Sequence, residues 1–249
     1  MATTVGLGGH GGGHTPAVHD DHGHDFHVLK HQFEDLDQQN ESYIVGMWSF
    51  LVTEVMFFGA LFMAYSLYRA NYQRDWYLAH EHLSVAWGGL NTFNLLVSSF
   101  FMAMAVRAAQ LHNRTGVLRW LTLVQACAAG FLVIKYIEYS EKFRDNLWPG
   151  PNFTTNPEVL HGANLNHAQL FYGLYFGMTG LHGVHILVGM GLIGALMMLW
   201  YKKKPIVTQD YIPTELIGLY WHFVDIVWVF LFPLYYLMPL PNGMHPVGH

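Results

Sequence analysis

Five polar side chains interrupt long apolar stretches of the sequence, and their types could ligate a metal, move a proton or hold helices together. They are Glu54, His182, His185, His222 and Asp225. Two imidazoles on facing helices can bind a haem iron, so His185 and His222 are candidates for that role. Intramembrane carboxylates often mark proton or ion paths, so Glu54 and Asp225 are candidates for a relay. The third interpretation is a hydrogen-bonded cluster that fixes helix packing or holds a lipid head group, because buried polar groups must be satisfied before they need another function.

The segments that carry these residues are predicted to be transmembrane helices. Of the 249 residues, 52% are hydrophobic and only 12% are charged, whereas a soluble domain has about 25% charged residues. A helix needs roughly 20 mostly apolar residues to cross a bilayer, and five segments are long enough: about 44–68, 86–108, 118–140, 169–200 and 214–238. Their apolar runs are continuous rather than alternating, which excludes barrel strands. We therefore predict an all-α polytopic membrane protein whose residues 44–238 form a bundle of five transmembrane helices.

Helical geometry brings the five polar residues to similar depths. At a rise of about 1.5 Å per residue, Glu54 lies near mid-membrane, and His182 and Asp225 fall at nearly the same level. A spacing of three residues places His182 and His185 on one helix face, and the same spacing joins His222 to Asp225. We therefore expect the five side chains to meet in the bundle interior, where each partly offsets the desolvation of the others.

The distribution of Lys and Arg predicts the orientation. With the N-terminus inside, the inner segments hold seven of them, at positions 30, 107, 114, 119, 202, 203 and 204, and the outer loops hold four, at positions 69, 74, 142 and 144. An excess of positive charge inside favours an inner N-terminus and an outer C-terminus, with residues 239–249 as a short outer tail. Residues 1–43 contain nothing like a cleavable signal, so we expect the first helix to direct insertion itself.

The N-terminal segment 1–43 is rich in glycine and histidine, and we expect it to be largely disordered because it has no core to bury. Imidazoles and carboxylates at short spacing can capture a divalent transition metal. The candidates, His19, His22, His24 and His27, are indicated by composition rather than by ligand geometry, so no firm metal site is predicted.

Several other classes of site are excluded by the sequence. Cys127 is the single cysteine, so the chain has no two-thiolate copper or iron–sulfur site of its own. The sequence has no basic surface that would indicate binding of nucleic acid. The H-E-x-x-H, Walker and nucleophile-elbow patterns are missing, which gives no support to autonomous catalysis.

Three further features concern the helix surfaces and ends. Lys135 and Glu138 lie toward the outer end of the third segment, where long side chains can reach the interface. Tyr236, at the end of the fifth segment, fits an interfacial aromatic belt. Gly173 and Gly177 form a small-xxx-small pair, which favours close approach by another helix.

The chain resembles subunit III of haem–copper terminal oxidases, the family of cytochrome c oxidase subunit III and its quinol-oxidase relatives. The resemblance covers about residues 44–238 and rests on five motifs: MWSFLVTEVMFF around Glu54, LNTFNLLVSS at 90–99, IKYIEY around Glu138, GLHGVHILVG at 180–189 and YWHFVDIVWVFLF at 220–232. The last two motifs, in this order and at this separation, are highly specific.

This resemblance implies an accessory subunit with no catalytic residue and no cofactor of its own. In the family, subunit I holds the haems and the active-site copper, and subunit II holds the other copper centre where there is one. The expected partners are therefore subunits I and II, with a small subunit IV as a further candidate, and membrane phospholipid. We expect an oxidase of a bacterial inner membrane that reduces O2 to water and pumps protons, with cytochrome c as electron donor. The alternatives are a quinol oxidase and an independent proton- or ion-translocating protein.

The resemblance also implies roles for single residues. Subunit III supports proton uptake by subunit I, and Glu54 matches the intramembrane carboxylate of the family. The matching recurrent polar positions are His182, His185, His222, Asp225, Glu138 and Glu215. Histidines of this family do not ligate haem, which argues against the haem interpretation. The chain corresponds to the last five helices of the seven-helix form, so another subunit would have to supply the second wall of the family's lipid-filled cleft.

Overall fold

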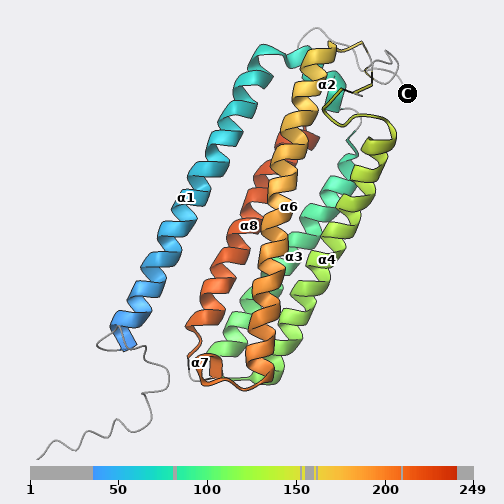
Figure 1. The fold of residues 1–249 in the computed structure, drawn as a ribbon. Coiled ribbons are helices and arrows are strands. Elements are labelled where there is room, and N and C mark those ends of the chain that lie inside the picture. The colour runs from blue at the N-terminus through green and yellow to red at the C-terminus, as the bar shows by residue number, and fades with distance from the viewer. Residues whose placement is uncertain are drawn as a thin grey trace, which may run out of the picture.

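The computed structural model describes residues 36–80, 83–151, 153–154, 160, 162–208 and 210–239, with side chains from residue 38 onward. Five long helices make up most of this structure: α1 (Leu36–Asn71), α3 (Val85–Gln110), α4 (Arg114–Arg144), α6 (Leu165–Tyr201) and α8 (Ile212–Tyr236). Two short helices, α2 (Gln73–His80) and α7 (Pro205–Thr208), lie at opposite ends of the molecule (Figure 1). The metal candidates His19, His22, His24 and His27 lie outside the described residues.

All five long helices are long and apolar enough to cross a membrane, which confirms the prediction of an all-α protein with five spanning helices. All five begin before the predicted apolar segments, and α1 begins at Leu36 rather than near residue 44. Its first turns, LDQQNES, contain neither glycine nor proline, so nothing breaks the helix before the apolar stretch. The fifth helix, α8, has a proline in its first turn, where the missing N–H has no partner to lose.

Four helices, α3, α4, α6 and α8, form an antiparallel bundle. The most extensive packing joins α3 to α4, and α8 packs against both α3 and α6. One close approach depends on Gly189 of α6, where a Cβ atom would lie 2.8 Å from the ring of Trp221 on α8. That ring is fully buried, and its Nε1 donates to the hydroxyl of Ser98 on α3 (3.0 Å). The glycine therefore determines how closely α6 and α8 pack.

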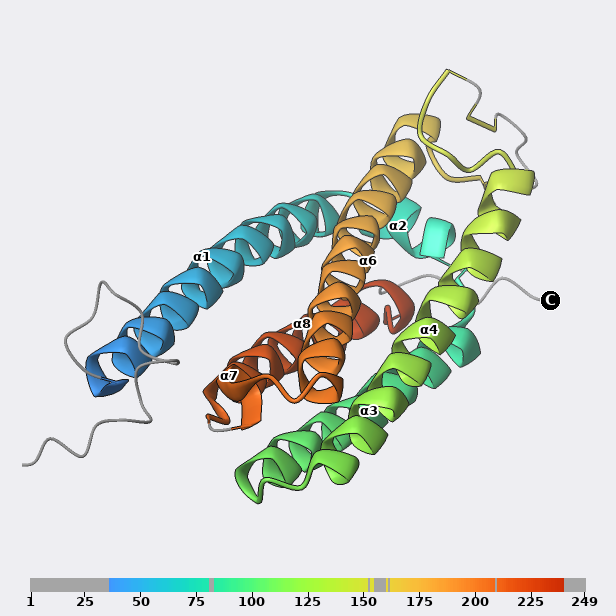
Figure 2. The ribbon, with the colours of Figure 1, turned by 60° about the horizontal axis from the view of Figure 1, so that its bottom comes forward.

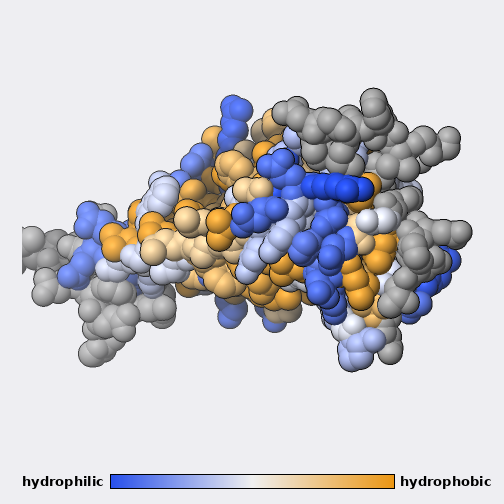
Figure 3. Space-filling view, turned by 90° about the horizontal axis from the view of Figure 1, so that it is seen from above, coloured by the Kyte–Doolittle hydropathy of each residue, from blue (hydrophilic) through white to orange (hydrophobic). Residues whose placement is uncertain are grey.

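α1 lies on one side of this bundle rather than inside it. It packs mainly on α8, with smaller contacts to α2 and α6, and it diverges from the other helices toward its N-terminus (Figures 1 and 2). Leu51, Phe58 and Tyr65 face the bundle and are buried, whereas Val45 and Met56 are 64% and 70% exposed. Viewed from the end that carries α2, hydrophilic side chains gather over that end and hydrophobic ones over the flanks (Figure 3). The apolar flank of α1 is thus left open by the described residues.

Three helices end in the same backbone conformation without glycine. His112, Asn146 and Lys203 follow α3, α4 and α6, and their φ angles are 50°, 52° and 53°. In each case the next N–H donates to a carbonyl five residues earlier, at 2.9 to 3.1 Å. This is the Schellman arrangement, which glycine usually completes because other L residues are strained in the left-handed region.

Lys203→Gly is therefore expected to stabilise the protein by about 1 kcal/mol, because glycine removes the left-handed strain at this position. Lys202→Gly is the matched control, since Lys202 has φ −77° and gains nothing from glycine. Thermal unfolding of the two variants checks the prediction. Equal shifts of Tm at both positions would contradict it.

Candidate functional site

A hydrogen-bonded pair joins α1 to α6 near the middle of the molecule. Glu54 Oε2 lies 3.1 Å from His185 Nε2, and the two side chains are 20% and 18% exposed. His185 Nδ1 is bonded to the carbonyl of Leu181 (2.8 Å), and a carbonyl only accepts, so Nδ1 carries a proton. Nε2 then either accepts a hydrogen bond from neutral Glu54 or, in the imidazolium form, donates one to its carboxylate. In both arrangements the pair shares one proton and is neutral as a whole.

Neighbouring groups hold this pair in position. The ring of Phe58 packs edge-on against His185, with centroids 5.2 Å apart. Tyr220 of α8 donates to the carbonyl of His185 (3.0 Å), which fixes the α6 backbone beside α8. The pair is therefore held in a fixed position in which both side chains are partly exposed.

His222 has a different partner. Its Nδ1 is hydrogen-bonded to Ser99 of α3 (2.6 Å), so it links α8 to α3. His185 and His222 thus bond to groups on different helices, which is not the arrangement of two axial haem ligands. Within the described part of the chain, no three His, Cys, Asp or Glu side chains are grouped to hold a metal ion.

His182 and Asp225 lie deeper, in the core of the four-helix bundle. His182 is 1% exposed and Asp225 is 3% exposed. Neither the ring nitrogens of His182 nor the carboxyl oxygens of Asp225 have a hydrogen-bond partner among the described residues. The depth argument predicted that the five polar side chains would meet in one cluster. In the structure they do not form a single hydrogen-bonded cluster. Depth along a helix is set by residue number, whereas the facing direction depends on helix rotation, which the sequence did not supply.

A buried ionic network that the sequence analysis missed connects α4, α6 and α8. Lys135 Nζ donates to Glu138 Oε2 (2.9 Å) and to the hydroxyl of Tyr236 (2.6 Å). The other carboxylate oxygen of Glu138 accepts from Tyr175 (2.7 Å) and from Tyr236. Lys135 and Glu138 are only 7% and 4% exposed, so the expectation that they reach the interface was wrong. Opposite charges three residues apart in an apolar helix were the available signal for a buried pair.

The remaining positions singled out from the sequence are Glu215 and the glycine pair. Glu215 lies in the first turn of α8, where a negative charge suits the N-terminal end of the helix dipole. A Cβ added at Gly177 would meet nothing within 4 Å, and one at Gly173 would only touch Pro149 at 4.0 Å. These glycines therefore do not mediate close helix packing within the chain.

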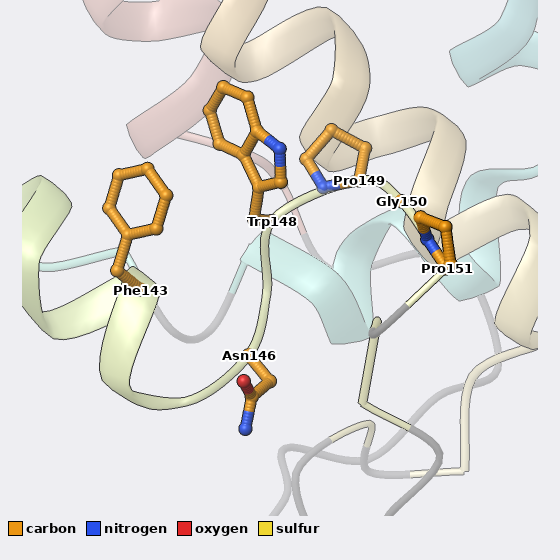
Figure 4. A pocket seen from close by; sticks show the side chains of 6 residues that line it. All are labelled: Phe143, Asn146, Trp148, Pro149, Gly150 and Pro151. Atoms are coloured by element: carbon orange, nitrogen blue, oxygen red, sulfur yellow. The ribbon is translucent and has the colours of Figure 1, made fainter.

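A hollow of about 280 Å³ follows α4 at the end of the molecule that carries α2. The rings of Phe143 and Trp148 stack beside it, with centroids 5.0 Å apart and an interplanar angle of 19° (Figure 4). The remaining lining residues are Asn146, Pro149, Gly150 and Pro151. None of these side chains is titratable, so the hollow adds no acid, base or anionic metal ligand to the site.

Known proteins are similar to this chain over most of its length. The family model for cytochrome c oxidase subunit III matches residues 157–239, which include α6 and α8. Quinol oxidase subunit 3 of Bacillus spizizenii is 30% identical over 89% of this chain and 98% of that protein. Cytochrome c oxidase subunit 3 of Synechocystis is 32% identical over 78% of this chain and 74% of that protein. A heme-copper oxidase subunit I+III of Aeropyrum pernix is 28% identical over 78% of this chain and 22% of that much longer protein.

Proposed function

Because the chain belongs to the subunit III family of haem–copper oxidases, we propose that it is the accessory subunit of a respiratory oxidase that reduces O2 to water and pumps protons. The family consists of non-catalytic subunits that work in a complex with other oxidase subunits. In our proposal, subunits I and II carry the haems and copper, and the complex resides in a bacterial inner membrane. We propose that the N-terminus of this chain lies inside and its C-terminus outside.

Subunit I is the proposed neighbour of the open flank of α1. The exposed apolar side chains of that flank suit burial against another apolar helix surface. The Aeropyrum relative, whose name joins subunits I and III in one protein, supports a close association of the two. Subunit III would stabilise subunit I there, and membrane phospholipid could fill the remaining space. The rate at which turnover decays in complexes prepared with and without this chain tests the stabilising role, and equal decay rates would contradict it.

Cytochrome c is the proposed electron donor, and quinol is the alternative. Relatives of both kinds are similar to this chain, with identities of 32% and 30%. The purified complex should therefore be assayed for O2 consumption with reduced cytochrome c and, separately, with a quinol. Turnover with quinol alone would exclude our choice of donor.

The Glu54–His185 pair is the observation that carries a role in proton supply. It shares one proton, is partly exposed and lies midway along α1 and α6. We place the pair beside the proton-uptake route of subunit I, where it influences local hydration and proton delivery without being an obligatory carrier.

Glu54→Gln is expected to lower the turnover of the complex by less than tenfold, which corresponds to less than about 1.4 kcal/mol in the barrier. The amide keeps the hydrogen bond to His185 but cannot exchange the shared proton. Steady-state O2 consumption of the purified complex measures the effect, and Glu41→Gln, an exposed position on the same helix, is the matched control. A complete block by Glu54→Gln alone would make Glu54 an obligatory relay and contradict the proposal.

A further inference from the structure

The core of the four-helix bundle contains three buried polar side chains whose hydrogen-bonding atoms all lack a partner among the described residues. They are Asn91 on α3, His182 on α6 and Asp225 on α8, and they are 0%, 1% and 3% exposed. In folded proteins, more than about 90% of buried polar groups are bonded to protein atoms or to ordered water. Six unsatisfied atoms on three facing helices therefore indicate a site for a small polar ligand.

Trp228 links the three helices that carry these side chains. Its indole ring stacks on His182, with centroids 5.1 Å apart. Its Nε1 donates to the hydroxyl of Thr92 (3.1 Å), the residue that follows Asn91 on α3. Asp225 lies three residues before Trp228 on α8, which places it on the same helix face one turn away. Trp228 thus contacts His182 and bonds the residue next to Asn91. Asn91 itself lies two turns from Ser98, on the face of α3 that bonds Trp221 of α8.

The fourth side is supplied by α4, which contributes the ring of Phe131 and the ammonium group of Lys135, 4.7 Å from the centroid of the Trp228 ring. Phe131 packs edge-on against both Trp228 and His182, with centroid distances of 4.8 and 5.6 Å. Ala128, one turn away on the same helix, is fully buried. Aromatic rings thus pack closely around these buried side chains, so a ligand there must be small.

No cation among the described residues is available to neutralise Asp225. The Lys135 ammonium group is bonded to Glu138 (2.9 Å). Ser99, which lies beside Asp225, is bonded to His222. The other ionisable groups near this layer are His182, which is itself unpartnered, the Glu54–His185 pair and the thiol of Cys127. An isolated carboxylate is so costly in a membrane interior that the neutral acid is favoured.

We propose that Asn91, His182 and Asp225 form an internal water-binding site in which Asp225 is protonated and water molecules join the three side chains. A carboxylic acid and a neutral imidazole each offer one donor and at least one acceptor, and an amide offers two donors and one acceptor. Water complements all of them because it both donates and accepts. A divalent cation does not fit, because it needs ionised carboxylate ligands and several more oxygens. The site would hold a proton inside the subunit, separate from the one that Glu54 and His185 share.

Infrared spectroscopy of the purified oxidase complex tests the protonation of Asp225. The wild-type complex should show the carbonyl band of a protonated carboxylic acid that shifts in D2O, and Asp225→Asn should remove that band. Asp145→Asn is the matched control, because Asp145 is exposed and should leave the band unchanged. We expect Asp225→Asn to assemble with Tm within a few degrees of wild type, since one neutral polar group replaces another of the same shape. An assembled Asp225→Asn complex that loses no acid carbonyl band relative to wild type would overturn the proposal.

A high-resolution cryo-electron microscopy map of the wild-type complex tests the ligand directly and decides the matter even if the variant fails to assemble. Water density within hydrogen-bonding distance of at least two of the three side chains supports the site. Density for a cation coordinated by Asp225, or direct bonds among the three side chains with no water between them, overturns it. Neither measurement depends on the electron donor or on a role in proton supply, so failure here is distinguishable from failure of the proposed function.

Discussion

Replacing Gly189 with valine is expected to prevent normal assembly of the chain into the oxidase complex. A Cβ atom at this position would lie 2.8 and 2.9 Å from two ring carbons of Trp221 and 3.2 Å from the ring of Tyr220. Trp221 is fully buried and hydrogen-bonded to Ser98, so its ring cannot swing aside without losing that bond. Valine adds two methyl groups beyond the Cβ atom, which brings the cost of overpacking to about 3 kcal/mol. Membrane content of the chain and its recovery with subunit I measure the effect.

Gly191→Val, two residues further along α6, is the control for this prediction. A Cβ atom at Gly191 would meet nothing within 4 Å, and the intrinsic helix propensity of valine is better than that of glycine. Gly191→Val should therefore be recovered in nearly wild-type amount. Normal assembly of Gly189→Val would mean that α6 and α8 are not packed as closely as described.

Lys135→Met is expected to destabilise the protein by about 3–5 kcal/mol, because it leaves the buried carboxylate of Glu138 without its cation. The two charged atoms are 2.9 Å apart, and both side chains are almost fully buried. The hydroxyls of Tyr175 and Tyr236 would still donate to Glu138, but neutral donors do not replace a counter-ion. Thermal unfolding of the purified complex, followed by the loss of this subunit, gives the change in stability.

The double variant Lys135→Met with Glu138→Gln separates charge burial from packing. Glutamine is neutral and can still accept from both tyrosines, so the double variant should be more stable than Lys135→Met alone. The gain is expected to be about 2 kcal/mol, within the range of coupling energies for residues in contact. Additive losses in the two single variants would show that the ion pair is not coupled, contrary to the geometry.

The architecture was predictable because spanning helices have a strong signal in sequence. Continuous apolar runs such as the one around Phe58 predict a membrane helix from length alone, and all five predicted helices are present. Their ends were less predictable, because polar residues at the start of α1 continue the helix. Helix termini depend on local hydrogen bonding, and hydropathy is insensitive to it.

The candidate site was predictable in its residue types and depths but not in its pairings. Glu54 bonds to His185 rather than to His182 or Asp225, whose levels were predicted to match its own. His222 bonds to Ser99, and Asp225 bonds to no described residue. A rotation of one residue position, about 100°, decides which neighbour a side chain faces. Hydropathy also assigned Tyr236 to the interface, but its hydroxyl belongs to a buried ionic network.

The position of α1 matters for biosynthesis, because the helices are synthesised in sequence order. α1 is synthesised first, yet its main partner in the finished molecule is α8, which is synthesised last. It must therefore wait in lipid as a single span, which suits a helix with apolar side chains around most of its surface. Glu54 enters the bilayer before His185 exists, and an isolated carboxylate is strongly disfavoured there. The nascent helix thus brings the proton of this acid into the membrane with it. The imidazole of His185, which comes to share that proton, is synthesised 131 residues after Glu54.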